Sequence, residues 1–322
     1  MRAVVFAGRL AEIRASRLHA TGRLASAVAA SQSHVTLSAQ THIDWIARTG
    51  HTERIPIPNA RALAAGFHFG WAIGPEGAAS WGSDTRGQTA GGGAVLRDAS
   101  QVASGLDHAL LLSGDQVYTC GRAYMLTVNT DGQLGRGSRA YERELAPVDI
   151  PARVVRVRAG GDTSLAIADD SVWVWGNAEY GQALGPAADR IPAPMRGELA
   201  AEAGRVVDAA VGGSFVLLLN DHGEVYAAGY GALGTGHVKE DVPRRITGLP
   251  PIADISAGLD YAAALTTDGC VYAWGINRHG RLGDGVEGKE HVYRPALVEY
   301  DGRVSSVACG SDALIALAGV DE

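Results

Sequence analysis

Cysteine is scarce in this sequence. Cys120, Cys270 and Cys309 are its three cysteines, an odd number whose spacing matches no zinc-ligand pattern. A disulfide framework and a cysteine-ligated metal are therefore excluded as organising features. We expect all three to be buried, reduced thiols in an intracellular protein.

Long apolar runs and excess basic charge are missing too. No apolar stretch approaches the roughly 18 residues that a membrane-spanning helix needs, and the run Phe215 to Leu219 is typical of a core strand. The formal net charge is -7, whereas nonspecific nucleic-acid binding depends on clustered Lys and Arg. The composition therefore predicts no membrane span and disfavours direct nucleic-acid binding.

Signatures of catalysis and of metal binding are absent as well. The ten histidines show no paired spacing, and there is no Gly-x-Ser-x-Gly elbow. His34 and His108 share a repeat position with Phe69 and Tyr261, so we interpret them as structural. Residues 229–234 match Gly-x-Gly-x-x-Gly, but the prolines that follow exclude the helix a dinucleotide site requires. We predict no catalytic residue, no cofactor and no metal.

Glycine, in contrast, is abundant, and it recurs in a pattern. One unit, clearest at residues 255–283, reads as strand, glycine turn, strand, Asp-Gly turn, strand and glycine-bounded loop. The glycine before the second strand recurs, with Ser31 as a substitute in the first unit, at Gly66, Gly105, Gly160, Gly212, Gly258 and Gly310. Six steps lead from position 31 to position 310, which gives about 46 residues per repeat, enough for one small sheet.

Each repeat offers four strand-like segments. The third ends in Trp-Gly at Trp81, Trp175 and Trp274, and a proline such as Pro147 precedes the fourth, at its start or outer edge. The last repeat lacks its third strand, and Val4 to Gly8 has the composition of the missing piece. We therefore predict an all-β fold, a seven-bladed β-propeller of four-stranded antiparallel blades, closed by the N-terminal strand in the last blade. The single domain of residues 1–322 then contains repeats at about 25–59, 60–98, 99–152, 153–204, 205–250, 251–302 and 303–322 plus 1–8.

The motifs of these units resemble the repeats of the regulator-of-chromosome-condensation family. The likeness rests on Gly-x-Asp-(His/Tyr)-x-x-x-Leu, the Asp-Gly turn, Val-Tyr-x-Trp-Gly and Asn-x-x-Gly-Gln-Leu-Gly. It is strong from about residue 99 to 317, fair for 60–88 and poor for 9–59. The resemblance implies a seven-bladed β-propeller, but it says less about function because the motif residues are turn and core positions. The Gly-Trp-Arg-His-Thr motif of the light-sensing members is absent, so we expect the tryptophans to pack in the core.

Two features are candidates for a partner surface. The loop of the third repeat is lengthened between Gly121 and Gly132, and its composition is that of an interface anchor. The alternative is that this loop folds back and buries its apolar side chains. In addition, one aspartate recurs two positions after the repeat glycine, either as an acidic rim for a basic partner or as the cap of its own turn. The candidate residues are Arg122, Tyr124, Met125, Leu126, Asn129 and Asp131 of the loop, with Asp107, Asp162, Asp260 and Asp312 of the turns.

The sequence thus favours a non-enzymatic platform for protein–protein interaction. The family resemblance implies one alternative, a guanine-nucleotide exchange factor for a small GTPase, in which a lengthened loop would disturb the nucleotide site. In size and simplicity the chain also resembles compact members of the family that consist of the propeller alone, and this resemblance implies another alternative, an accessory partner in tRNA wobble-base or diphthamide modification. We expect a cytoplasmic or nuclear protein. Mitochondrial import is the alternative, because Arg2, Arg9, Arg14, Arg17 and Arg23 resemble a presequence.

Overall fold

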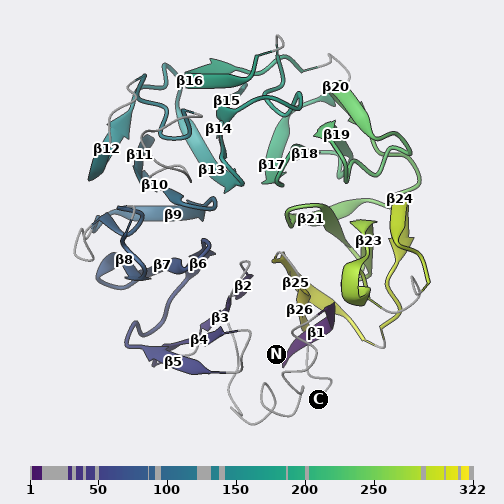
Figure 1. Ribbon diagram of the computed structural model, residues 1–322, viewed down its shortest axis with the longest axis horizontal. Coiled ribbons are helices and arrows are strands. Elements are labelled where there is room, and N and C mark those ends of the chain that lie inside the picture. The colour runs from purple at the N-terminus through teal and green to yellow at the C-terminus, as the bar shows by residue number, and fades with distance from the viewer. Residues whose placement is uncertain are drawn as a thin grey trace.

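Seven antiparallel sheets surround a central axis, and the first strand of each lies nearest that axis (Figure 1). This computed structural model describes residues 2–8, 28–30, 34–38, 41–47, 51–85, 87–90, 96–121, 132–137, 142–185, 188–199, 203–283, 288–300, 302–310 and 313–318. We number the sheets as blades 1 to 7 in the order of their first strands. The predicted β-propeller architecture is confirmed.

Blades 1 to 3 contain β2 (Val28–Ala30), β3 (His34–Ser38), β4 (Ile43–Ala47), β5 (Thr52–Ile55), β6 (Ala62–Ala65), β7 (Phe69–Gly74), β8 (Gly77–Gly82), β9 (Ala99–Ser104), β10 (His108–Ser113), β11 (Gln116–Gly121) and β12 (Glu142–Val148). Blades 4 and 5 contain β13 (Val154–Gly160), β14 (Thr163–Ala168), β15 (Val172–Asn177), β16 (Arg190–Arg196), β17 (Val206–Val211), β18 (Phe215–Asn220), β19 (Val225–Tyr230) and β20 (Lys239–Arg245). Blades 6 and 7 contain β21 (Ile252–Ala257), β22 (Tyr261–Thr266), β23 (Val271–Ile276), the short 3-10 helix η4 (Arg278–Gly280), β24 (His291–Leu297), β25 (Val304–Cys309), β26 (Ala313–Ala318) and β1 (Arg2–Gly8).

The N-terminal strand belongs to the last sheet. β1 pairs antiparallel with β26, with Val4 opposite Ala316 and Gly8 opposite Ala313, so it takes the third position of blade 7. Five sheets have four strands, whereas blades 2 and 7 have three within the described residues. The N-terminal strand therefore lies in the last blade, as predicted, whereas the closure of a four-stranded blade by this strand stays a prediction.

The core lies between neighbouring blades. β14, β18 and β22 are buried along their whole length, because each is flanked within its own sheet and covered on both faces by adjacent sheets. This arrangement explains the unbroken apolar run from Phe215 to Leu219, a predicted core strand. Trp81, Trp175 and Trp274 are likewise buried, as expected.

The loop after the third strand joins each blade to the next one. The carbonyl of Gln133 in blade 3 accepts hydrogen bonds from Trp175 Nε1 and Ser164 Oγ of blade 4, each at 2.9 Å. In the same way, Ala232 of blade 5 accepts from Trp274 Nε1 of blade 6 at 3.0 Å. The Gly-Gln-Leu-Gly and Trp-Gly motifs therefore recur because they are the two halves of one contact between blades.

Trp274→Phe is expected to destabilise the fold by about 2–3 kcal/mol, because it leaves the buried Ala232 carbonyl without its donor and removes ring volume. Chemical denaturation measures this change. Trp173→Phe is the control, since that ring is only partly buried, and its cost should stay below about 1 kcal/mol. Equal costs for the two variants would contradict the role of the contact between blades.

Two sequence predictions need correction. Cys120 and Cys309 are buried free thiols, but Cys270 is exposed, because it follows the Asp268-Gly269 turn at the edge of the sheet. Pro147 does not precede the fourth strand of blade 3 but lies within β12, opposite Tyr118. That strand is the outer one, where a residue without an N–H disrupts no inner ladder.

Candidate partner-binding face

One end of the propeller carries both the turns between first and second strands and the loops after third strands. We call this end the loop face. Its geometry follows from the hairpin register: His108, at the start of β10, lies opposite Gly121, at the end of β11. The carbonyls of Asp162 and Asp260 accept hydrogen bonds from Asn177 N and Ile276 N, which fastens each turn to the end of its third strand.

The channel mouth on the loop face is held by backbone hydrogen bonds between blades. Phe67 N donates to Leu106 O at 3.0 Å, and Leu106 N donates to Gly161 O at 2.9 Å. Gly213 N donates to Leu259 O at 2.9 Å. Because each bond joins the turn of one blade to that of the next, main-chain hydrogen bonds fasten the mouth at these three junctions.

The predicted turn aspartates lie on the loop face in three different environments. Asp107 is almost fully buried, whereas Asp162 is half-buried. Asp260 forms an ion pair with Arg281, whose side chain is 3% exposed, at 2.5 Å, and the guanidinium of Arg281 also lies 4.8 Å from the Tyr261 ring centroid. The described aspartates are thus integrated into their own blades, and their role in partner binding stays a prediction.

The remaining predicted residues lie outside the described residues. These are Arg122, Tyr124, Met125, Leu126, Asn129, Asp131 and Asp312. The two ends of the lengthened loop are described, and Gly121 lies beside the Asp107 turn on the loop face. The described start of the lengthened loop therefore lies at the same end of the molecule as the described turn aspartates.

An exposed aromatic strip follows the outer rim of the loop face across blades 4 to 6. It consists of the aromatic residues Tyr180, Tyr230, His291 and Tyr293 together with the exposed apolar residue Val238. The Tyr180 and Tyr230 rings lie 6.1 Å apart, and the His291 and Tyr293 rings are stacked at 6.0 Å. The loop between β19 and β20 connects the two pairs, since Gly231 N donates to Val238 O and Gly236 N donates to Tyr293 O.

The sequence held a signal for this strip that motif analysis passed over. Tyr180 and Tyr230 each precede a glycine of the loop motif, and His279 holds the same position in blade 6. All three side chains are exposed, with Tyr230 at 48% and Tyr180 at 37%. Only the two glycines of the loop motif and the apolar residue between them recur from blade to blade. The position before the first of these glycines therefore varies freely and faces solvent.

His108 forms a buried network at the inner edge of the same loops. Its Nε2 lies 2.9 Å from Ser164 Oγ, and the hydroxyl proton of Ser164 is already donated to Gln133 O. His108 Nε2 must therefore donate, which places the ring proton of the neutral imidazole on Nε2. Burial without a compensating charge lowers the pKa of His108 to about 3.

The central channel contains charges that sequence analysis did not identify. Arg156 and Arg158 on β13 both contact Asp208 on β17, at 3.2 and 2.6 Å. Burial, together with the neighbouring Asp208 carboxylate, raises the pKa of Asp254 on β21 to about 6. Arg158 and Asp208 are about 50 positions apart in the sequence, and so are Asp208 and Asp254. Only the ring of blades brings these residues together.

Within the described residues there is neither a metal-binding cluster nor a membrane-spanning helix. No group of three or more His, Cys, Asp or Glu side chains there could hold a metal ion. In that same part of the chain, no helix combines the length and apolar character needed to cross a bilayer.

Comparison with known proteins identifies the repeats. The model of the regulator of chromosome condensation (RCC1) repeat matches residues 115–167, 222–265 and 268–317, and a second RCC1-repeat model matches residues 252–281. The human RCC1-like G exchanging factor-like protein is 35% identical over 239 residues, covering 68% of this chain and 49% of the relative. The ultraviolet-B receptor UVR8 of Arabidopsis thaliana is 32% identical over 224 residues, covering 65% and 48%. This chain thus spans about half the length of these curated relatives.

Solved structures agree with the repeats. Human WBSCR16 superposes with a TM-score of 0.80 at 26% identity, covering 92% of this chain and 87% of that one. Prp20p from Saccharomyces cerevisiae superposes with a TM-score of 0.75 at 17% identity, covering 90% and 81%, a likeness that concerns the fold alone. From its repeats, its blades and these relatives, the chain is a member of the RCC1-repeat family.

Proposed function

We propose that this chain is a non-enzymatic platform that binds a protein partner on its loop face, over blades 4 to 6. The observation that supports the proposal is the exposed aromatic strip. Tyrosine supplies a large contact area at low entropic cost and is enriched at the centres of protein interfaces. Two solvent-exposed aromatic pairs, one between blades 4 and 5 and the other on β24 of blade 6, are a cost to solubility unless a partner covers them.

Charged residues around the strip suit an interface rim. Glu240 is buried and accepts from both His237 Nδ1 and Arg244 Nε at 2.8 Å, which holds the two basic groups beside Val238. Polar groups at the edge of an apolar patch give orientation and specificity more than affinity. The hydrogen bonds between neighbouring turns at the channel mouth link blades beneath such a surface, including blades 5 and 6.

The double substitution Tyr230→Ala and Tyr293→Ala is expected to reduce partner capture at least tenfold, because aromatic anchors typically contribute about 2 kcal/mol or more each. Quantitative mass spectrometry after affinity purification measures this loss. Tyr300→Ala is the matched control, since Tyr300 is exposed but follows β24 at the opposite end of the blade. If the double variant captured the same proteins as the unaltered chain, the loop-face proposal would be wrong.

Exchange activity on a small GTPase is the second candidate function. It is supported by the name of the human relative, an RCC1-like G exchanging factor-like protein, and by Prp20p, whose structural study describes binding to Gsp1p and histones. A nucleotide-release assay against a panel of small GTPases tests it. No acceleration by excess protein would remove this candidate. Acceleration that disappears on deletion of residues 124–130 would instead replace the platform proposal. The tRNA wobble-base or diphthamide alternative stays a prediction.

A further inference from the structure

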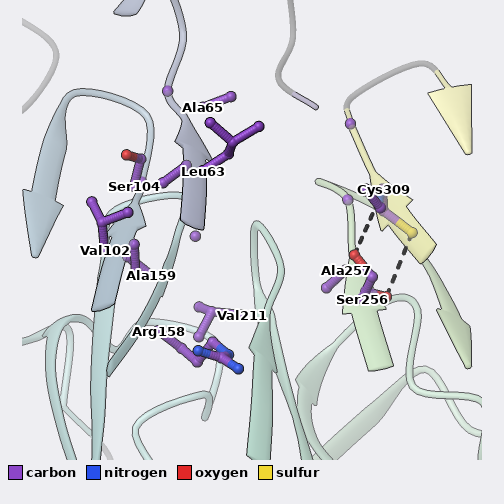
Figure 2. Close-up of a pocket in the computed structure, with 18 of the residues that line it drawn as sticks. Leu63, Ala65, Val102, Ser104, Arg158, Ala159, Val211, Ser256, Ala257 and Cys309 are labelled. Atoms are coloured by element: carbon purple, nitrogen blue, oxygen red, sulfur yellow. Dashed lines mark hydrogen bonds between the residues drawn. The ribbon is translucent and has the colours of Figure 1, made fainter. Parts of the chain in front are cut away.

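The central channel widens into a cavity of about 680 Å³ beside the inner strands. Its volume lies in the range of small-molecule sites. Figure 2 shows Arg158 and Val211 on one side of the channel and Ser256 and Cys309 on another, with Leu63 and Val102 completing the view. Most of the wall is small side chains and main chain, so charged groups are conspicuous there.

All the charged side chains that line this cavity within the described residues are arginines. They are Arg61, Arg156 and Arg158, and no Asp or Glu lines the cavity in that part of the chain. This local excess contrasts with the formal net charge of -7 for the whole protein. The nearest carboxylates, Asp208 and Asp254, are not among the lining residues, and even with both ionised the three arginines outnumber them.

Arg158 is fixed in place by the protein. Its Nε donates to Ala209 O at 3.0 Å, its Nη1 donates to Val157 O at 2.9 Å, and its Nη2 lies 2.6 Å from Asp208 Oδ1. A guanidinium held in this way adds positive potential to the cavity without the entropic cost of being ordered by a ligand.

Arg156 has donors to spare. Within the described residues its one hydrogen bond runs from Nη1 to Asp208 Oδ2 at 3.2 Å, and its side chain is 40% exposed. The carboxylate of Asp208 is shared with Arg158, so it neutralises only one of the two charges. A planar guanidinium with free N–H groups matches the paired oxygens of a carboxylate or a phosphate.

We propose that the channel cavity is a binding site for a small molecule bearing a carboxylate or phosphate group, with Arg156 as its principal anchor and Arg158 as a fixed second charge. The remaining wall, formed by residues such as Leu63, Val102 and Ala257, would contact the apolar part of the ligand. This site is separate from the aromatic strip and does not depend on the identity of a protein partner.

Phenyl phosphate and benzoate are suitable probes, with phenol as the uncharged control. Isothermal titration calorimetry at constant ionic strength should show saturable binding of at least one of the two anions and none of phenol. Binding of phenyl phosphate alone, or of benzoate alone, would identify the oxyanion that the site prefers. Absence of saturable binding by both anions, or equal binding of phenol, would overturn the proposal.

Arg156→Gln should weaken anion binding about tenfold or more, the usual effect of losing a charge-assisted hydrogen bond. Arg156→Lys should give an intermediate loss, since it keeps the charge but not the planar fork. Arg196→Gln is the matched control, because Arg196 is exposed on the outer strand of the same blade, and it should stay within about twofold of the unaltered protein. Unchanged thermal unfolding of Arg156→Gln shows that the variant is folded. Unaltered affinity in that folded variant would contradict the assignment.

Discussion

Removal of residues 1–8 is expected to destabilise the propeller by about 5 kcal/mol or more and to produce a chain that aggregates. β1 covers one edge of β26, whose Leu314 and Ile315 are fully buried. Re-exposing a buried apolar side chain costs about 1.5–3 kcal/mol, and the freed strand edge is a template for pairing with other chains. Since domains are stable by only about 5–15 kcal/mol, this loss is decisive.

Thermal unfolding and sedimentation of the truncated chain measure the effect. A synthetic peptide of residues 1–8 should restore the unfolding temperature in a concentration-dependent way, because a ligand that binds only the folded state stabilises it by mass action. A peptide of the same composition in scrambled order is the control. A truncated chain that unfolds at the original temperature would show that β1 is dispensable.

Acid is expected to destabilise the fold through His108. The pKa of His108 is about 3 in the folded protein and about 6.5 in an unfolded chain. As the pH falls below about 6.5, the unfolded state binds a proton that the folded state does not accept. The contribution of His108 to stability is therefore complete above about pH 6.5, and it is lost as the pH falls towards 3, by up to about 1.4 kcal/mol per pH unit.

His108→Phe isolates this effect, since Phe215 occupies the same position in blade 5. The variant loses the hydrogen bond to Ser164 and is expected to be less stable at pH 7. As the pH falls from 6.5 to 4.5, the free energy of unfolding of the variant should rise by about 2–3 kcal/mol relative to that of the unaltered protein. The deficit at pH 7 is then reduced or reversed. Urea denaturation of both proteins at several pH values measures this difference in stability. The contributions of the other titrating groups are common to both proteins and cancel in the difference.

His51→Gln serves as the control for a general change in charge, because His51 is exposed. Its stability should follow the same pH dependence as the unaltered protein. Parallel curves for His108→Phe and the unaltered protein would show that the buried imidazole does not couple folding to pH.

The repeat pattern was sufficient to predict the blades and the sheet to which the N-terminal strand belongs. Gly212 and Gly258 mark turns that the structure places where expected, and Trp175 and Trp274 are buried in equivalent positions. These predictions succeeded because each depends on a residue and its near neighbours, repeated several times. The exposure of Cys270 was not predicted, because cysteine does not recur at the equivalent position of the other repeats and so no pattern indicates whether the side chain is buried.

The channel charges and the aromatic strip were not predicted. Arg156 and Asp208 belong to different blades and carry no shared motif, whereas Tyr180 and Tyr230 hold a motif position whose residue type varies from blade to blade. Their proximity depends on how far one sheet is rotated from the next, and that rotation is set by packing between blades. The sequence by itself determined the number of blades, the strand order and the sheet that the N-terminal strand joins, since hydrophobic periodicity and turn chemistry are local. Only the tertiary structure decided which non-repeated side chains meet, because the ring joins residues that the linear chain keeps about 50 positions apart.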